Sequence, residues 1–205
     1  MQRHIADMDS ELQSSKSHLT SLRDDLAELQ KLILEDPLTG VGNRRLFDET
    51  ILRVNVLRQT AAPTYLFLVD LDKFKNINDT HGHGTGDDVL RFVGSSLMKL
   101  AVGATVARYG GDEFAIFITV EHDQAKQLAE DICQFFFVND LTVRNTSEPF
   151  GKLTISLGAA ILRVEDSSDS WFERADKLLY SAKAGGRNRA LVERTRSDKP
   201  ICVTN

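Results

Sequence analysis

The chain has 205 residues, of which 41% are hydrophobic and 27% are charged. This balance is typical of a globular protein with a real core, and the length allows one ordinary domain plus an appendage. The formal net charge of −5 argues against a broad surface for nucleic acid or anionic membrane, although local positive charge could still bind a nucleotide.

Cysteine usage and hydropathy limit where the protein works. Cys133 and Cys202 have neither metal-site spacing nor a disulfide framework. No apolar run is long enough to cross a bilayer, and the N-terminus lacks the apolar core of a signal peptide. We therefore expect a cytoplasmic protein with no membrane segment in this chain. A sensor domain upstream in a longer parent protein would not be visible here.

Residues 1–35 are predicted to form a long helix with a heptad pattern. One core position of the heptad holds Ile5, Leu12, Leu19, Leu26 and Ile33. The other core position holds Met8, Ser15, Leu22 and Leu29. So narrow an apolar stripe can be buried only against another copy or against the chain's own domain. A parallel coiled-coil homodimer is favoured, because Glu11 would then lie opposite Lys16 across the pair. A helix folded back on the domain is the alternative.

The helix is expected to stop at Asp36, because proline disfavours helical geometry in the residue before it. The stretch DPLTGVGNRR then supplies a candidate hinge at Pro37 and Gly40 and a helix N-cap at Asn43. The sequence therefore predicts a dimerisation and signalling helix over 1–35, a domain over 36–194 and a flexible tail over 195–205.

Helices and strands alternate after this boundary. Helices are expected near 44–59, 74–78, 86–100, 123–137 and 170–184. Strands are expected at 64–71, 141–145, 153–162 and 189–192, with a hairpin turning at paired glycines in ATVARYGGDEFAIFITV. The pattern predicts an α/β (α+β) fold in which helices flank a central, largely antiparallel sheet.

Two groups of acidic residues indicate a metal site. Leu66, Leu68 and Asp70 share one face of an apolar strand, where a carboxylate is costly unless it is paired or binds a metal. Asp112 and Glu113 follow glycines that permit positive φ and close approach to the backbone. Hard oxygen ligands favour Mg²⁺, with Mn²⁺ as the second choice. The alternatives are a strand-end aspartate that caps a turn and an ordinary acidic hairpin.

The third signal is basic. In KAGGRN, Lys183 and Arg187 flank two glycines at the end of a helix, and together with Lys75 they could neutralise a triphosphate. The alternative is a helix C-cap at Gly185.

These motifs resemble the GGDEF family of diguanylate cyclases. DPLTGVGNRR, DLDKFKNINDTHGHGTGDDVL, RYGGDEF, ADKLLYSAK and GGRN stand in the family's order over residues 36–192. The resemblance implies a fold like the palm of polymerases and of nucleotidyl cyclases. It also implies a diguanylate cyclase that condenses two GTP molecules into cyclic di-GMP and releases pyrophosphate.

The resemblance further implies a role for each matching position. Asp70, Asp112 and Glu113 would bind two metal ions per GTP, with the carbonyl of Leu71 completing the ligand set. Asp112 or Glu113 would assist removal of the 3′-hydroxyl proton before attack on the α-phosphate, and Lys75 would stabilise charge on the phosphates. The remaining substrate-binding positions are Asn78 and Asp87 at the guanine edge, backbone amides near Lys73 and Phe74, and Lys183 and Arg187 at the terminal phosphates.

The catalytic unit would be a dimer of half-sites, each binding one GTP, joined by the coiled coil. Many members of the family that the chain resembles carry an Arg-x-x-Asp product-binding site five residues before the paired glycines, but here that position reads Ala101-Val102-Gly103-Ala104. We therefore expect weak feedback by the product. The competing hypotheses are a catalytically silent GTP-binding regulator that controls a partner protein, and a coiled-coil signalling scaffold.

Overall fold

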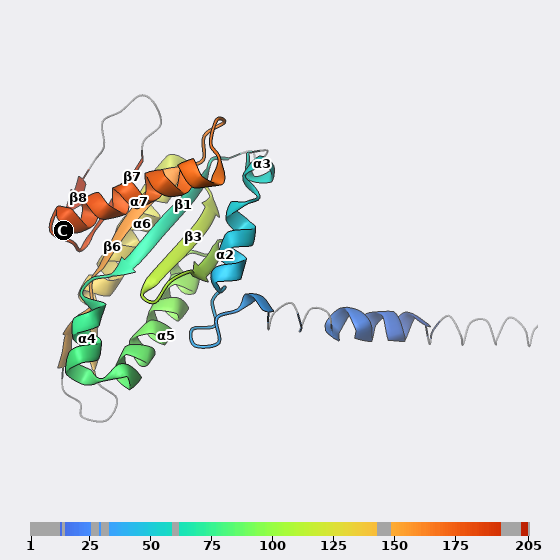
Figure 1. Ribbon diagram of the computed structural model, residues 1–205, viewed down its shortest axis with the longest axis horizontal. Helices are drawn as coiled ribbons and strands as arrows, with labels where there is room; N and C mark the ends of the chain where they lie inside the picture. Colours follow the sequence, from blue (N-terminus) through green and yellow to red (C-terminus); the bar gives the residue numbers. More distant parts are fainter. Residues whose placement is uncertain are drawn as a thin grey trace, which may run out of the picture.

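A six-stranded sheet with the order β2-β3-β1-β6-β7-β8 lies at the centre of the fold (Figure 1). The computed structural model describes residues 13, 15–25, 29, 33–58, 62–142, 149–193 and 202–204. Neighbouring strands are antiparallel except β6 and β7, which are parallel, so the predicted largely antiparallel sheet is confirmed. The strands of this sheet are β1 (Thr64–Leu71), β2 (Thr105–Arg108), β3 (Glu113–Thr119), β6 (Ile155–Ile161), β7 (Arg189–Val192) and β8 (Cys202–Thr204).

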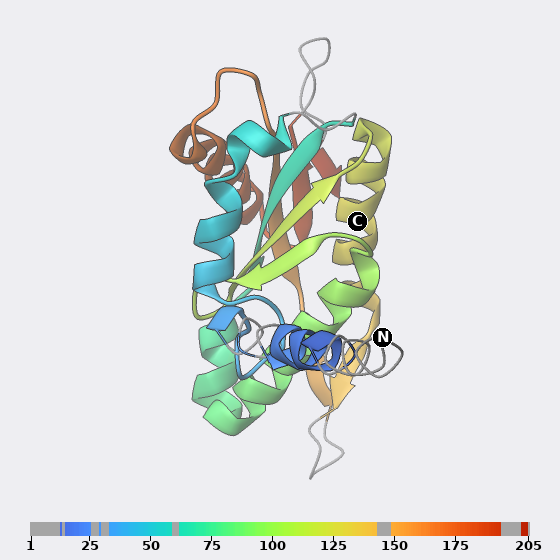
Figure 2. The same ribbon diagram turned by 90° about the vertical axis from the view of Figure 1, so that its right-hand side faces the viewer.

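Helices cover both faces of the sheet. The helices are α2 (Arg44–Ile51), α3 (Val54–Leu57), α4 (Phe74–His81), α5 (His83–Leu100), α6 (His122–Val138) and α7 (Ser168–Ala184). One face packs against α5 and α6, and the opposite face packs against α2 and α7 (Figure 2). None of the helices in the described part of the chain has the length and apolar character needed to cross a membrane.

The central strand β1 explains why the sheet has two buried faces. Every residue of β1 is buried, and its side chains alternate between the faces. Tyr65 and Phe67 belong to the core beneath α5 and α6, whereas Leu66 and Leu68 belong to the core beneath α2 and α7. The same alternation puts Asp70 on the α2 and α7 face, as the sequence predicts.

The described part of the N-terminal helix projects away from the domain (Figure 1). Leu19 and Leu22 are 58% and 56% exposed, so this part of the stripe is not buried against the chain's own domain. The predicted core positions Ile5, Met8, Leu12 and Leu26 lie outside the described residues.

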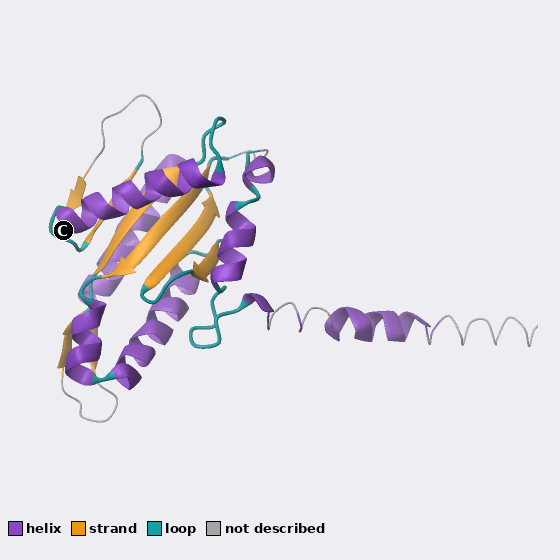
Figure 3. Ribbon diagram, viewed as in Figure 1, coloured by secondary structure: helices purple, strands orange, loops and turns teal. Residues whose placement is uncertain are grey.

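The linker between this helix and α2 lies against the edge strand β2 (Figure 3). Gly42 donates its N–H to the carbonyl of Val106 and accepts from the N–H of Arg108, at 2.9 and 2.7 Å. Asn43 caps α2 by accepting from Leu46 N–H, and its Nδ2 donates to the carbonyl of Ile33 at the end of the stalk. The segment after the candidate hinge is therefore bonded to β2, and Asn43 joins the start of α2 to the end of the stalk.

Three segments differ from the prediction. The helix expected over 44–59 is interrupted by a turn at Leu52 and Arg53 between α2 and α3. Of the strand expected over 141–145, residues 143–145 lie outside the described residues; the described part belongs to β4 (Asp140–Thr142), which pairs with the unexpected strand β5 (Pro149–Lys152) in a separate two-stranded sheet. Cys202–Thr204, within the expected flexible tail, form β8, which pairs antiparallel with β7.

Candidate active site

Two of the predicted acidic residues lie directly opposite each other on neighbouring strands. In the β1–β3 register Asp70 pairs with Glu113, and in the β1–β6 register it pairs with Ser156. Residues opposite each other in an antiparallel pair present their side chains on the same face. Asp112 immediately precedes β3, and its carbonyl accepts from Leu71 N–H at 3.3 Å. We refer to Asp70, Asp112 and Glu113 as the carboxylate cluster.

The electrostatics of Asp70 agree with the closeness of the three carboxylates. Burial is the largest cause of the raised pKa of Asp70, and the negative charges of Asp112 and Glu113 raise it further. The ammonium of Lys183, 2.7 Å from Asp70 Oδ2, opposes both effects. Concentrated negative charge of this kind attracts a cation.

Of the two properties expected of the paired glycines, the structure shows the close approach but not the positive φ. Neither Gly110 nor Gly111 has positive φ. A Cβ atom on Gly110 would lie 2.2 Å from Glu113 Oε2, so the carboxylate of Glu113 packs over Gly110. Gly110 is therefore needed for close approach of the carboxylate, and not for an unusual turn.

The carboxylate cluster has the donor chemistry that Mg²⁺ prefers. Its oxygens are hard ligands, and one of them already holds a cationic group, the Lys183 ammonium. Among the described residues, however, no three His, Cys, Asp or Glu side chains stand in the arrangement of a metal-binding group. The residues fit a divalent cation in chemistry and proximity, but their side chains must reorient to enclose one.

The turn after β1 presents the start of α4. Lys73 adopts the left-handed conformation with φ of 58°, and no side chain among the described residues caps the helix there. The first N–H groups of a helix favour anions when nothing else bonds them. Lys75 follows on the first turn and is exposed. The N-terminus of α4 and two lysines thus adjoin the end of β1 that carries Asp70.

Asn78 lies where α4 and α5 pack together, and Asp87 follows the glycine at this contact. A Cβ atom on Gly86 would lie 1.9 Å from Asn78 Oδ1 and 3.2 Å from Phe74 Cζ, so the two helices approach closely at this glycine. Asp87 follows Gly86 directly, and both Asn78 and Asp87 are half-buried. The structure therefore places the Asn78 side chain at this contact between helices, with Asp87 next to the contact on α5.

Close packing of α7 on β6 positions the basic residues. A Cβ atom on Gly158 would lie 2.2 Å from the backbone N of Leu179 and 2.4 Å from the carbonyl oxygen of Ala175. This contact lets α7 run tightly along the sheet, so Lys183 in its last turn reaches Asp70. Arg187 lies just beyond the helix in a left-handed conformation, with φ of 66°.

Two residues near the site were not identified from the sequence. Asp72 is buried and accepts hydrogen bonds from three donors, while Asp70, two residues earlier, pairs with Lys183. Arg108 Nη2 donates to the carbonyl of Gly111 at 2.7 Å, and Arg108 Nη1 also pairs with Asp36. The repeated Asp-x-Asp spacing was the available signal for Asp72, but spacing alone does not show which aspartate faces the hairpin.

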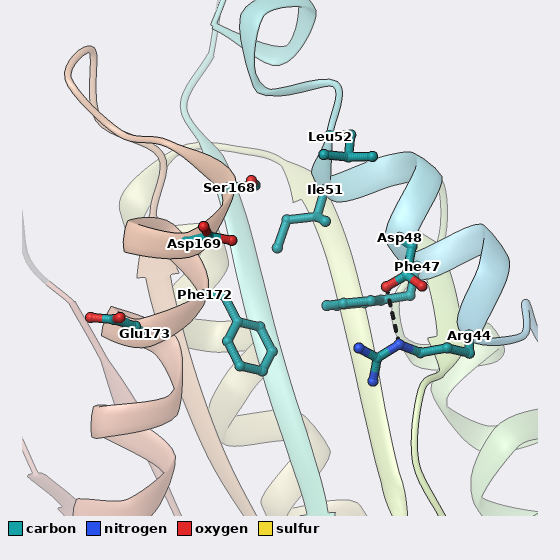
Figure 4. A pocket seen from close by; sticks show the side chains of 9 residues that line it. All are labelled: Arg44, Phe47, Asp48, Ile51, Leu52, Ser168, Asp169, Phe172 and Glu173. Carbon is teal, nitrogen blue, oxygen red and sulfur yellow. Dashed lines mark hydrogen bonds and ion pairs between the residues drawn. The ribbon is translucent and has the colours of Figure 1, made fainter.

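A hollow of about 470 Å³ lies on the same face of the sheet, between α2 and α7 (Figure 4). Phe47 and Phe172 point into it from the two helices, and Phe47 stacks on Tyr109 with ring centroids 4.8 Å apart. Arg44 lies over the Phe47 ring and donates to the carbonyl of Tyr109. This aromatic packing supports the hairpin that carries Asp112 and Glu113.

Comparison with known proteins agrees with this arrangement. The family described as "Diguanylate cyclase, GGDEF domain" matches residues 33–189. Diguanylate cyclase VdcA of Vibrio cholerae is 35% identical over 188 residues, which cover 90% of this chain and 54% of VdcA. Diguanylate cyclase DgcZ of Escherichia coli is 36% identical over 160 residues, covering 76% of this chain and 52% of DgcZ. The chain thus spans about half the length of these curated relatives.

Solved structures show the same likeness. The coiled coil and GGDEF domain of DgcB from Caulobacter crescentus, in complex with c-di-GMP, matches with a TM-score of 0.79 and 33% identity, covering 91% of this chain and 99% of that one. Diguanylate cyclase SiaD from Pseudomonas aeruginosa, in complex with its activator SiaC, matches with a TM-score of 0.79 and 27% identity, covering 93% of this chain and 74% of that one. With the carboxylate cluster and its neighbouring lysines in place, these matches show that the chain belongs to the diguanylate cyclase GGDEF-domain family.

Proposed function

We propose that this chain is a diguanylate cyclase that joins two GTP molecules into cyclic di-GMP and releases pyrophosphate. The observation that carries the proposal is the carboxylate cluster, in which Asp70 and Glu113 lie opposite each other in register. Relatives at about one-third identity that are named diguanylate cyclases support the same reaction. The α4–α5 contact and the basic residues lie at the same end of the sheet as the cluster.

Asp70, Asp112 and Glu113, with the carbonyl of Leu71, are the residues that would hold Mg²⁺. The bound cation would lower the pKa of a ribose 3′-hydroxyl and neutralise charge on the phosphates. Asp112 or Glu113 accepts the proton of this hydroxyl. Because Lys183 donates to Asp70 Oδ2, the ammonium must leave that oxygen when it becomes a metal ligand.

Asn78 and Asp87 select guanine. The carboxylate of Asp87 accepts from the ring N–H and the amino group of guanine, which adenine cannot both offer. The side-chain amide of Asn78 both donates and accepts. The position of Asn78 at the α4–α5 contact, with Asp87 directly after Gly86, supports this assignment.

Cations and helix amides hold the triphosphate. Backbone N–H groups near Lys73 and Phe74 contact phosphate at the start of α4, where the macrodipole favours negative charge. Lys75 stabilises charge that builds up on the phosphates during transfer. Lys183, once released from Asp70, and Arg187 bind the terminal phosphates.

One domain supplies half of the reaction, because two GTP molecules must attack each other in opposite directions. The N-terminal helix would join two copies and raise the effective concentration of the half-sites. Leu19 and Leu22, exposed on the described part of this helix, fit that role.

The test is incubation of the chain with GTP and Mg²⁺, followed by mass analysis of the product. We expect a new cyclic dinucleotide, and we expect Asp112→Ala to abolish it while the far-ultraviolet circular dichroism stays unchanged. Asp131→Ala is the matched control, because Asp131 is an exposed carboxylate of α6 on the opposite face of the sheet. Full activity of Asp112→Ala would contradict the assignment of the carboxylate cluster.

The same assay separates the alternatives. Binding of GTP without turnover would support a silent regulator, and absence of both would support a scaffold.

A further inference from the structure

The carboxylate of Asp72 joins three segments that are far apart in the chain. Its side chain is 2% exposed. Oδ1 accepts from Ser156 Oγ at 2.7 Å, and Oδ2 accepts from Thr154 Oγ1 at 2.8 Å and from the backbone N–H of Asn188 at 3.0 Å. The end of β1, the start of β6 and the loop between α7 and β7 therefore meet at one buried anion.

Burial makes these bonds necessary. A buried carboxylate is costly unless its oxygens accept hydrogen bonds, and bonds to an ionised group are stronger than neutral ones. The two hydroxyl donors come from β6 and the residue just before it, which the sheet holds in place. The Asn188 N–H is the donor that belongs to a loop, so this bond fixes the loop relative to the sheet.

The loop that Asp72 fixes is strained and carries a positive charge. Arg187 and Asn188 both have left-handed backbone conformations, with φ of 66° and 46°. Such conformations cost free energy in residues other than glycine and persist only where surrounding contacts impose them. Arg187 Nε lies 4.0 Å from Asp72 Oδ1, and its side chain is 48% exposed. Asp72 thus orients the guanidinium while leaving it accessible to a ligand.

Asp72 also adjoins the start of α4, the second element to which we assign phosphate binding. The next residue, Lys73, has the left-handed conformation that starts α4, and Asp72 N–H donates to the carbonyl of Thr154 at 3.0 Å. One aspartate therefore fixes both the first turn of α4 and the loop that carries Arg187. Asp70, in contrast, faces the hairpin and Lys183.

We propose that Asp72 is a positioning residue for the triphosphate, and that it acts through the α7–β7 loop by holding Arg187 beside the N-terminus of α4. The inference rests on the proposed function and deepens it. Through Arg187, Asp72 would affect binding of the β- and γ-phosphates. It would have no role in binding the guanine or the metal.

The test compares nucleotides that differ only in their phosphates. Isothermal titration calorimetry in EDTA, which prevents turnover, measures binding of GTP and of GMP to the unaltered chain and to Asp72→Asn. The substitution keeps the size of the side chain but removes its charge and one acceptor. We expect the Kd for GTP to rise about tenfold, as for loss of a hydrogen bond to a charged group, while the Kd for GMP changes less than about twofold.

Asp166→Asn is the matched control for loss of a buried carboxylate. The Asp166 side chain is 5% exposed, accepts from Arg163 N–H at 2.7 Å and pairs with Arg174 of α7. Its substitution should lower thermal stability as Asp72→Asn does, with no change in the ratio of the two Kd values. If the effect of Asp72→Asn were purely structural, both variants would change the ratio of the Kd values for GTP and GMP in the same way.

A double-mutant cycle tests whether Asp72 acts through Arg187. In an Arg187→Ala background, Asp72→Asn should add less than about twofold to the Kd for GTP, because the group that it positions is absent. Thr154→Val, which removes one hydroxyl donor to Oδ2 and keeps the shape, should raise the Kd for GTP in the same direction by a smaller factor. This variant decides the question if Asp72→Asn does not fold.

Equal losses for GTP and GMP, additive effects in the cycle, or no change in any Asp72 or Thr154 variant would overturn the inference while leaving the proposed function standing. Absence of both GTP binding and turnover by the unaltered chain in the presence of Mg²⁺ would overturn both.

Discussion

Gly86 shows how a residue without a side chain can determine the position of Asn78, a proposed substrate-binding residue. The atom that its Cβ would meet, Asn78 Oδ1, is the far end of a flexible side chain. Gly86→Ala should therefore leave the fold intact but displace the Asn78 amide, so the KM for GTP should rise about tenfold and preference for guanine over adenine should fall. Steady-state kinetics with GTP and ATP measure both.

Gly84→Ala is the control for this substitution. Gly84 lies in the same helix, a Cβ atom there would meet no neighbouring atom within 4 Å, and the alanine variant should gain slightly in stability. Unchanged kinetics in both variants would contradict the placement of Asn78 at the base.

Asp36 links protonation to stability at the junction with the stalk. Burial raises its pKa, but hydrogen bonds from Thr39 and the charge of Arg108 outweigh burial, so the pKa lies below its ordinary value of 3.8. Because the folded pKa is depressed, the stabilisation is present above pH 3.8 and is lost as the pH falls through the folded pKa. Asp36→Asn should cost about 2 kcal/mol at pH 7 and progressively less as the pH falls below 3.8 through the folded pKa.

Urea unfolding of the unaltered chain and of Asp36→Asn at several pH values checks this expectation. A difference in unfolding free energy that does not shrink on acidification would show that the ionised carboxylate contributes nothing.

The turn between α5 and β2 bears on feedback by the product. Residues 101–104 offer neither a guanidinium nor a carboxylate, and Ala101 and Ala104 line a hollow of about 580 Å³ together with Leu34 and Met98. A cyclic dinucleotide carries two phosphates, which this apolar surface cannot pair. When cyclic di-GMP is added at a concentration equal to the KM for GTP, we expect the initial rate of the cyclase reaction to fall by less than about twofold. Strong non-competitive inhibition in a product titration would contradict the expected weak feedback.

Among the elements, α7 depends on one glycine for its distance from the sheet. The Cβ of Gly158→Ala would strike the backbone of α7 at Leu179 and Ala175, which cannot rotate away. The helix must shift, so the free energy of unfolding should fall by about 3 kcal/mol and Lys183 should lose its contact with Asp70. Chemical denaturation measures the first effect.

Gly111→Ala provides the comparison. Gly111 has no atom within 4 Å of a Cβ position and does not have positive φ, so alanine there should change stability by less than about 0.5 kcal/mol. Similar stabilities of the two variants would show that α7 can move away from β6 without cost.

Elements with a regular apolar pattern were predictable. β1 and the β2–β3 hairpin lie where alternation predicts them, and α6 differs from its expected range by one residue at each end. The turn that separates α2 from α3 was missed because Leu52 and Arg53 carry no proline or glycine signal. β8 was missed because a short strand at a sheet edge depends on its partner, here β7.

For the molecule as a whole, the exposed stripe of the N-terminal helix predicts self-association. Replacing Leu19 and Leu22 together by glutamate should convert a dimer into a monomer, because the charged side chains cannot be buried in a coiled-coil seam. Activity per chain should then fall most at low protein concentration. Sedimentation velocity and a dilution series measure the two effects.

Ser21→Glu controls for added charge on the same helix, since Ser21 lies off the apolar stripe. A dimer that survives the double substitution would show that the stalk is not the dimerisation element.

The family, the order of the elements and the candidate acids could all be read from the amino-acid sequence, because periodic apolar residues and five ordered motifs are local properties of the chain. Three pairings became visible only in the folded chain: Asp70 lies opposite Glu113, Asn78 packs over Gly86, and Asp72 bonds the loop of Arg187. Strand register and helix contact set these pairings, and both depend on packing between segments far apart in the chain.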